Sequence, residues 1–402
     1  MEFTLKEIKP ILKYIIENNK KIQENGQFPV SICACGESGV GKTSIMEQIA
    51  NELNMQFVKL NLAQITDPSE LCGWPIKEHY ICKPDGECKW VTAEVLDAYS
   101  KSGWIVTDET RMGYAIPAWL RNTGMDKGIL LCLDDANRCT NQVANAVMEI
   151  SCRQEYLSWK LPVGSTVLIT KNPDNGSYQV QSEDEAMLSR MITFNVKFDK
   201  NAYAEYAERI GIDGRAINFI LNSADELMDR SVTKEAKVNA RNYTMFANII
   251  SGIPDWSDPK NLALILQVAA GCFLDEDGIV GGMFTTFIAN KLDKLLSPED
   301  LIHKDWAYVK GVLEKQLYDD DNYRADIASI VTTRFVNYSL KYLEQKGNSI
   351  DPISDRILKI VDNDKQLLSE DLLFNLIKTL NKKFHGRCNK LILNPKIAKR
   401  LM

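Results

Sequence analysis

The chain lacks any run of eighteen or more apolar residues, the length that a membrane-spanning helix requires. Residues 1–15 mix charged and apolar side chains, so they also lack the apolar core of a secretory signal peptide. Internal repeats and low-complexity stretches are absent as well. These absences exclude a spanning helix and a repeat architecture, and they favour a cytoplasmic protein.

The chain also lacks an excess of basic residues. Its 48 Lys and Arg residues face 54 Asp and Glu residues, so the net charge is −6 and no general affinity for nucleic acid is expected. The distribution is uneven, because residues 372–402 hold eight basic residues and no acidic one, which leaves −14 on the first 371 residues. Apolar residues alternate with these cations, so we expect this basic tail to be an assembly contact, with nucleic-acid binding as the alternative.

The ten cysteines do not form the pattern of a disulfide framework. Four of them lie in apolar-rich segments, namely Cys33, Cys35, Cys132 and Cys152. Cysteine behaves there as a small hydrophobe, so a reduced protein is expected. His79, Cys82 and Cys88 suggest a metal site, but structural zinc sites need four ligands. We therefore predict no metal there and expect Cys82 and Cys88 to face each other across a hairpin.

Short apolar runs that alternate with helical segments predict an α/β domain with a largely parallel sheet. The five runs are residues 30–35, 57–62, 129–133, 166–170 and 192–198. About 65 residues separate the second run from the third, which is too many for a simple crossover. This insertion is predicted to contain a hairpin at residues 79–90, and a second hairpin is predicted at residues 155–164.

Helical periodicity begins the chain, at residues 1–25, and dominates it beyond about residue 200. The later predicted helices are residues 216–228, 240–250, 262–273, 301–317 and 327–343. Ser297 followed by Pro298 is a favourable helix start. A turn-rich segment at residues 254–259 predicts a boundary near residue 257. We therefore expect an α/β domain over residues 1–200, a helical segment over 201–257 and a helical C-terminal region over 258–402.

The segment Gly36-Glu-Ser-Gly-Val-Gly-Lys-Thr43 fits the phosphate-binding loop G-x-x-x-x-G-K-[ST] at every fixed position. A strand-like run precedes it and a helix-like run follows, so its N–H groups would face phosphates at the positive end of a helix. Lys42 would reach the β- and γ-phosphates, and the Thr43 hydroxyl would bind Mg²⁺. The predicted ATP-binding residues are Gly36, Glu37, Ser38, Gly39, Val40, Gly41, Lys42, Thr43 and Ser44.

Residues 129–135, ILLCLDD, read as a buried strand that ends in two carboxylates. This pattern is typical of a Walker B segment. Asp134 would hold Mg²⁺, and Asp135 would polarise the attacking water. The sequence thus predicts ATP and Mg²⁺ as cofactors and ATP hydrolysis as the activity.

The residues around these motifs resemble those of MoxR-type AAA+ ATPases. The resembling segments are Asp67-Pro-Ser-Glu-Leu-Cys-Gly73, Leu133-Asp-Asp-Ala-Asn-Arg138, Val167-Leu-Ile-Thr-Lys-Asn-Pro173 and Met187-Leu-Ser-Arg-Met191. They keep the family's order between residues 30 and about 250. Glu70, Ser189 and Met191 depart from its motifs. The resemblance implies a P-loop AAA+ core with a parallel sheet, followed by an α-helical lid over residues 201–257 and a helical C-terminal region.

The resemblance also implies three further site residues. Asn172 would be sensor 1, which positions water against the γ-phosphate. Arg190 would be the arginine finger, offered to the nucleotide of a neighbouring subunit, with Arg138 and Arg153 as the competing candidates. Arg241 would be sensor 2.

One departure concerns the catalytic acid, because the family's usual Glu is Asp135 here, shorter by one methylene. Asn61 could orient Asp135 before hydrolysis. Since positioning supplies much of the rate in phosphoryl transfer, an Asp would act through a shifted water or turn over slowly. We therefore predict ATP binding with an uncertain rate of hydrolysis.

The resemblance implies a ring, most commonly a hexamer, whose active sites lie between subunits. Such a ring would use ATP to remodel or mature a protein partner, often one with a von Willebrand factor A domain. Two alternatives stay open at this point. One is an ATP-gated assembly or scaffold protein with slow turnover, and the other is a motor that acts on nucleic acid.

Overall fold

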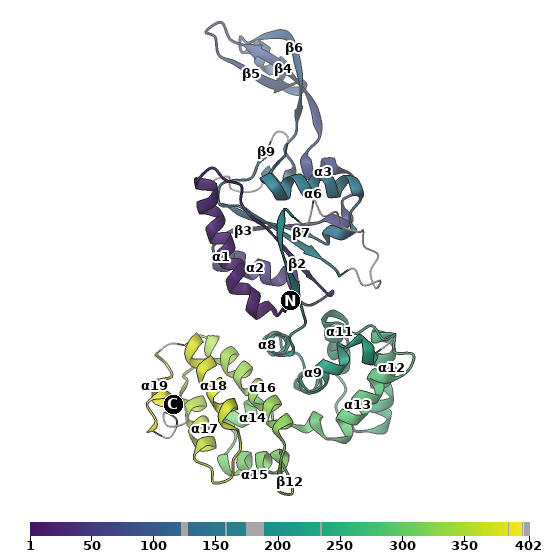
Figure 1. Cartoon of the computed structure of the whole chain (residues 1–402), viewed down its shortest axis with the longest axis vertical. Coiled ribbons are helices and arrows are strands. Elements are labelled where there is room, and N and C mark those ends of the chain that lie inside the picture. Colours follow the sequence, from purple (N-terminus) through teal and green to yellow (C-terminus); the bar gives the residue numbers. More distant parts are fainter. Residues whose placement is uncertain are drawn as a thin grey trace. The chain divides into compact units, whose positions relative to one another are not determined.

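The computed structural model describes residues 1–121, 128–156, 159–173, 189–233, 235–384, 386–395 and 397. The chain divides into two compact units, Met1–Lys197 and Phe198–Met402. Figure 1 shows that the first unit holds the larger sheets and that helices dominate the second. Among the described residues, no helix has both the length and the apolar character that crossing a membrane requires.

A six-stranded parallel sheet forms the centre of the first unit. Its spatial order is β1 (Glu2–Phe3), β11 (Met191–Val196), β2 (Ser31–Gly36), β10 (Thr166–Lys171), β7 (Ile129–Asp134) and β3 (Gln56–Asn61). Every neighbouring pair is parallel, so the segments that follow β2, β10 and β7 leave the sheet at the same edge. The five predicted strands are confirmed, whereas β1 was not predicted because two residues are too short to show a pattern.

Helices cover both faces of this sheet, which explains why its central strands are almost continuously apolar. Ile32 and Leu168 face α1 (Leu5–Glu24) and α2 (Lys42–Glu52). The next residue of each strand, Cys33 and Ile169, faces the opposite side and packs with α6, which spans Asn141–Arg153. A shift of one residue in register would exchange the two faces, so this burial fixes the register that the site depends on.

The helix α1 also fixes the start of β2 through one buried amide. Thr4 and Glu7 form a capping box at its first turn, and Ile8, Leu12 and Ile16 are buried. One turn further on, Asn19 lies fully buried and exchanges two 2.8 Å hydrogen bonds with the backbone of Val30. These bonds satisfy the backbone at the residue that precedes the strand leading to the predicted phosphate loop.

The insertion forms a separate antiparallel sheet in the order β5, β4, β6. Its elements are β4 (Pro75–Cys82), β5 (Cys88–Thr92), α4 (Leu96–Lys101) and β6 (Ile105–Tyr114). The hairpin at residues 79–90 is confirmed, with Gly86 at a φ of +92° in its turn. The third strand was not predicted, because most residues of β6 are exposed and show no apolar alternation.

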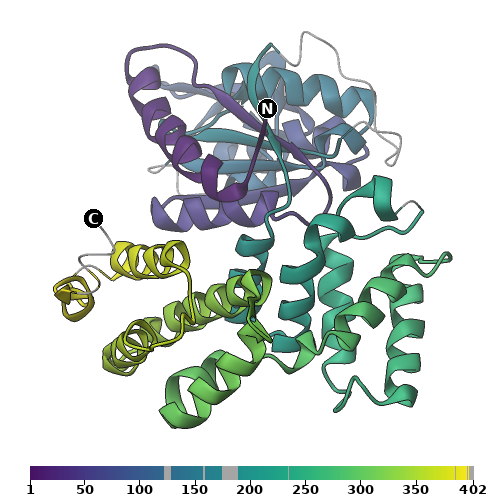
Figure 2. The ribbon, with the colours of Figure 1, turned by 60° about the horizontal axis from the view of Figure 1, so that its bottom comes forward.

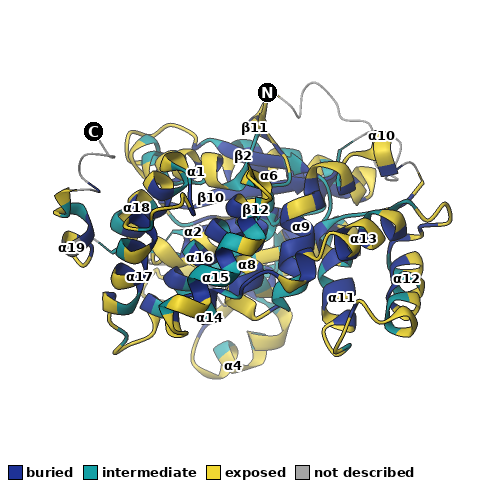
Figure 3. Ribbon diagram, turned by 90° about the horizontal axis from the view of Figure 1, so that it is seen from below, coloured by how far each residue is buried: buried dark blue, intermediate teal, exposed yellow. Residues whose placement is uncertain are grey.

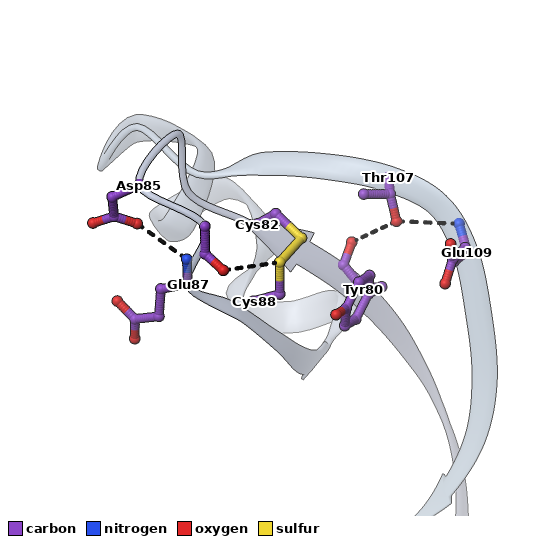
Figure 4. The surroundings of a disulfide bond; sticks show 8 residues. Tyr80, Cys82, Asp85, Glu87, Cys88, Thr107 and Glu109 are labelled. Atoms are coloured by element: carbon purple, nitrogen blue, oxygen red, sulfur yellow. Dashed lines mark hydrogen bonds between the residues drawn. A yellow bond between two sulfur atoms is a disulfide. The ribbon is translucent and has the colours of Figure 1, made fainter.

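The tip of this hairpin is closed by a disulfide between Cys82 and Cys88, shown in Figure 4. The prediction that these two cysteines face each other is confirmed, but the prediction of a fully reduced protein is wrong at this pair. The buried apolar core of the insertion sheet consists of only Ile81, Val91 and Trp104. A core this small gains from a covalent link, which the cysteine count alone did not indicate. The disulfide also removes both thiols as metal ligands.

The first unit contains several shorter elements near its edges. They are η1 (Leu62–Gln64), α3 (Pro68–Cys72), η2 (Ala93–Val95), α5 (Ala118–Arg121), η3 (Ala136–Arg138), β8 (Glu155–Tyr156) and β9 (Trp159–Lys160). The last two strands pair antiparallel, which confirms the second predicted hairpin. Its residues 157–158 lie outside the described part of the chain.

The second unit is helical, as predicted. Its helices are α8 (Lys200–Ile210), α9 (Gly214–Leu227), α10 (Arg230–Thr233), α11 (Ala240–Ile250), α12 (Pro259–Phe273), α13 (Ile279–Ala289), η4 (Leu292–Lys294), α14 (Pro298–His303), α15 (Trp306–Leu317), α16 (Ala325–Glu344), α17 (Asp351–Val361), α18 (Glu370–Lys383) and α19 (Asn389–Ile392). The short strands β12 (Tyr318–Asp319) and β13 (Asn322–Tyr323) pair between α15 and α16. Figure 2 shows these helices in teal through green to yellow, and in Figure 3 helices such as α11 and α17 carry both buried and exposed residues.

Two predictions about this unit have different outcomes. Ser297 caps α14 with Pro298 at its first position, as expected. The single helix predicted over residues 301–317 is wrong, because α14 ends at His303 and Asp305 caps the new helix α15. A side chain that caps a helix satisfies the first N–H groups of that helix, so a break forms where the apolar periodicity alone showed none.

The basic tail is built into the second unit. Leu380, Cys388 and Leu391 are fully buried in the same core as Phe219 and Phe246, so one core spans both sides of residue 257. The helical lid over residues 201–257 therefore stays a prediction. In the tail, Lys396, Lys399 and Arg400 lie outside the described residues. Several apolar residues that suggested an assembly contact thus pack within the chain, whereas Leu393 is 77% exposed.

Candidate ATP-binding site

The predicted phosphate loop links β2 to α2, as its motif requires. The strand ends at Gly36 and the helix begins at Lys42. A β-carbon on Gly36 would lie 2.4 Å from the carbonyl oxygen of Val196, and Gly41 has a φ of +96°. Both positions therefore need glycine, the first for space and the second for its backbone conformation.

Lys42 lies inside this loop. Its side chain is 93% buried, since only 7% of the residue is exposed, and Nζ donates to the carbonyl oxygens of Gly36 at 2.7 Å and Glu37 at 3.0 Å. Burial lowers the pKa of Lys42, while the carboxylate of Asp135 opposes the shift. An ammonium group has three N–H donors, so one is left for a phosphate oxygen.

Asp134 is held by three side chains at the end of β7. Its Oδ1 accepts from the hydroxyl of Thr43 at 2.9 Å and from the hydroxyl of Thr170, and Lys59 Nζ lies 2.7 Å from Oδ2. Burial raises the pKa of Asp134, but hydrogen bonds from Lys59, Thr170 and Thr43 outweigh burial and leave the pKa below its usual value. The carboxylate is therefore ionised at neutral pH.

These residues fit a magnesium ion. Mg²⁺ binds hard oxygen ligands, and it is typically held by one or two protein side chains together with phosphate oxygens. The Thr43 hydroxyl and the Asp134 carboxylate, which meet at 2.9 Å, supply such oxygens beside the phosphate loop. The ammonium group of Lys59 occupies the second oxygen of the same carboxylate.

Asp135 adopts a left-handed conformation, with φ 55° and ψ 43°, directly after β7. Asn172 Nδ2 donates to Asp135 Oδ1 at 3.0 Å, and the Asp135 N–H donates to the Thr170 hydroxyl at 3.0 Å. Asn137 holds Asn172 in turn, because its Nδ2 donates to the Asn172 carbonyl at 2.8 Å. The predicted acid, Asp135, is thus in contact with the predicted sensor, Asn172. Asn172 directly follows β10, and β10 lies between β2, which leads into the phosphate loop, and β7, which leads into Asp135.

Thr170, Lys59 and Asn137 were missed as site residues. Strand pairing is the signal that could have found two of them. The strand order puts β10 beside β7, and Lys59 precedes by two residues the position that pairs with Asp134. The predicted role of Asn61 is not supported, because its Oδ1 accepts from the Ala63 N–H at 3.1 Å and caps η1.

Residues 31–191 match the family model described as the AAA domain of the dynein-related subfamily. This segment contains the predicted phosphate loop, Asp134, Asp135 and Asn172. The chain contains an AAA+ ATPase domain. Its MoxR-type character stays a prediction.

Two curated relatives are similar to short parts of this chain. Midasin of Dictyostelium discoideum is 42% identical over 67 residues, which are 16% of this chain and 1% of midasin. Lon protease of Clostridium acetobutylicum is 41% identical over 54 residues, 13% of this chain and 7% of the protease. The chain therefore spans only a small fraction of these relatives.

Two solved structures from Thermotoga maritima also show similarity. One is the RuvB Holliday junction branch migration motor, with 14% identity, coverage of 66% of this chain and 80% of that chain, and a TM-score of 0.31. The other is a DNA polymerase III gamma subunit-related protein, with 13% identity, coverage of 98% of both chains and a TM-score of 0.29.

The predicted arginine finger lies at the far edge of the AAA+ sheet. Arg190 directly precedes β11, whose first residue, Met191, pairs with Ser31 at the start of β2. The phosphate loop begins at the other end of β2, five residues on, which is roughly 17 Å along a strand. Arg190 is exposed, and residues 187–188 of its motif lie outside the described residues.

The other candidate arginines lie elsewhere. Arg138 is exposed in η3, which directly follows β7 and Asp135. Arg153, at the end of α6, forms an ion pair with Glu149 at 3.3 Å. Arg241 lies in the first turn of α11 in the second unit and is exposed. Its role as sensor 2 stays a prediction.

Proposed function

We propose that this chain binds ATP with Mg²⁺, hydrolyses it and uses the energy to remodel a protein partner. The observation that carries hydrolysis is the 3.0 Å contact between Asn172 and Asp135 beside the phosphate loop. Lys42 holds the β- and γ-phosphates, Thr43 and Asp134 hold the metal, and Asp135 orients a water for attack. Mg²⁺ would neutralise charge that develops on the phosphate oxygens.

The position of Arg190 supports a ring. Its own phosphate loop begins roughly 17 Å away along the sheet, so a guanidinium there serves a neighbouring subunit better than its own. A ring also suits AAA+ proteins, which usually oligomerise, and we propose a hexamer. Steady-state ATPase activity should therefore rise more than proportionally with protein concentration, which phosphate release can measure. Nucleotide binding without turnover at any concentration would instead support the ATP-gated scaffold.

The insertion sheet supports a protein target. Its edge strand β6 exposes three large apolar side chains, of which Ile105 at 60% and Met112 at 68% are more exposed than Val106 at 40%. Residues 74–114 hold seven acidic and five basic residues, so this surface would repel nucleic acid. An edge strand with apolar side chains can accept an extended segment of another protein. A von Willebrand factor A protein, implied by the MoxR resemblance, is one such partner.

We expect the double variant Ile105→Ser and Met112→Ser to lose partner-stimulated ATPase activity while its basal activity stays unchanged. Both side chains are exposed, so their loss does not disturb a buried core. The matched control is Val163→Ser, which removes a 60% exposed apolar side chain of the same unit outside the insertion. ATPase assays with partners captured by a turnover-deficient variant would measure the effect. Equal stimulation of the double variant would exclude β6 as the contact.

A nucleic-acid motor is the second candidate function, and the basic tail favours it. Its exposed face carries Lys378, Lys382 and Arg387, whose described contacts include no carboxylate. Lys383, by contrast, pairs with Glu344 at 2.7 Å. Since Leu380 and Leu391 of the tail lie in the core of the unit, the three exposed cations are left for an anionic partner such as a phosphate backbone.

A charge-matched pair of triple variants separates these functions. One changes Lys378, Lys382 and Arg387 to Gln, and the control changes three other exposed lysines, Lys260, Lys304 and Lys346, to Gln. If the tail binds duplex DNA, the first variant should weaken binding and flatten its salt dependence by ~0.9 per lost contact, more than the control does. Fluorescence anisotropy at several salt concentrations would measure this. Equal behaviour of both variants would exclude the tail as a specific nucleic-acid surface.

A further inference from the structure

Lys59 stands out among the residues around the candidate magnesium position. It lies on β3, the last strand of the sheet, and its Nζ lies 2.7 Å from Asp134 Oδ2. The other oxygen of Asp134 accepts from Thr43 and Thr170. The two oxygens therefore have separate partners, with neutral hydroxyls on one side and a cation on the other.

This contact differs from an ordinary surface ion pair. The side chain of Asp134 is only 13% exposed, whereas that of Lys59 is 46% exposed, so the lysine reaches a nearly buried carboxylate from the solvent side. Together Lys42, Lys59, Asp134 and Asp135 carry two positive and two negative charges. A divalent cation that approaches Asp134 therefore meets a carboxylate that is already neutralised.

We propose that Lys59 competes with Mg²⁺ for Asp134 and thereby sets the magnesium concentration at which the nucleotide site loads. This inference rests on the proposed function. Lys59 is a positioning residue, because it acts through Asp134 and not on the nucleotide. Without metal its ammonium group holds the carboxylate beside the Thr43 hydroxyl. When the metal binds, the flexible four-carbon stem lets the ammonium group move into solvent.

The test compares Lys59→Met, which keeps much of the side-chain length but removes the charge, with Lys59→Arg, which keeps the charge. Lys9→Met is the matched control, because Lys9 pairs with Glu52 at 2.6 Å in the same unit but contacts no candidate site residue in the described structure. The readout is the magnesium concentration that gives half of the maximal binding of a fluorescent ADP. Turnover does not enter this measurement.

We expect this magnesium midpoint to fall about fivefold in Lys59→Met, the upper range for a partly exposed ion pair. Lys59→Arg and Lys9→Met should stay near the parent protein. Binding of the same probe in EDTA should be unchanged, because Lys59 is not proposed to contact phosphate. An equal thermal unfolding midpoint would show that Lys59→Met folds normally, as the exposure of Lys59 leads us to expect.

Three results would overturn the inference. An unchanged magnesium midpoint in Lys59→Met would make the contact a surface ion pair, and a higher midpoint would make Lys59 an aid to metal binding. Weaker binding in EDTA would assign Lys59 to the phosphates. In all three cases the parent protein still binds nucleotide, so the proposed function stands. If the parent protein binds no nucleotide, the proposed function and this inference fail together.

Discussion

Asp135→Asn is expected to bind ATP as the parent does and to lose turnover by ~10²-fold or more, the usual effect of losing a general base. The amide has almost the shape of the carboxylate, so the left-handed backbone and the neighbouring Asp134 should keep their positions. It no longer offers a carboxylate to polarise the attacking water. Phosphate release gives the rate, and equilibrium binding of a fluorescent ATP analogue gives the affinity.

Two companions make this result specific. Asp97→Asn removes a carboxylate from α4, in the insertion sheet, and should change neither measurement. Asp135→Glu restores the methylene that the family's usual Glu has. If the shorter side chain of Asp135 limits the rate of hydrolysis, this variant should hydrolyse ATP at least as fast as the parent. Hydrolysis by Asp135→Asn at the parent rate would show that another group activates the water, and the assignment of Asp135 would then be wrong.

The parts of the site that the sequence predicted are those whose residues lie next to each other in the chain. The phosphate loop is one such part, because its glycines, Lys42 and Thr43 fall within eight residues. Asp134 and Asp135 end a single strand. The central strands β2, β10 and β7 were predicted because they are buried on both faces and therefore almost continuously apolar.

The contacts between these parts depend on strand order, which the apolar runs do not encode. Lys59 reaches Asp134 only because β3 pairs with β7. Thr170 contacts the Asp134 carboxylate and the Asp135 N–H only because β10 lies on the other side of β7. The family resemblance did supply Asn172, since it assigned a role to a residue whose neighbours the sequence alone could not give. It also suggested Asn61, whose side chain caps its own turn.

Outside the site, predictions from apolar periodicity were incomplete or wrong where a local feature decides the structure. The exposed strand β6 carries no apolar alternation, and the break before α15 depends on the single capping residue Asp305. The basic tail was expected to pack between subunits because it is rich in apolar residues. Some of those residues complete the core of the second unit, as buried Leu380 and Leu391 show, whereas Leu393 is exposed, so the assembly contact stays a prediction.

The largest expected effect belongs to Arg190. Arginine fingers elsewhere contribute about 10³ to 10⁵ in rate, so Arg190→Ala should be almost inactive while it still binds ATP. Lys42→Ala should be inactive for a different reason, because the phosphate loop loses its only side-chain cation. If Arg190 acts on a neighbour, mixing equal amounts of the two variants should restore activity, since some interfaces then join an intact loop to an intact finger.

Random mixing makes this expectation quantitative. Half of the loops and half of the fingers are intact, so in a head-to-tail ring about a quarter of the interfaces, and about a quarter of the parent activity, should return. Mixing either variant with the Lys42→Ala, Arg190→Ala double variant restores no complete interface and is the matched control. Co-purification through tags on one variant must confirm mixed rings. Mixed rings without recovery would show that Arg190 does not complete the nucleotide site of a neighbouring subunit. The finger would then be Arg138 or Arg153, or the finger would act within its own subunit.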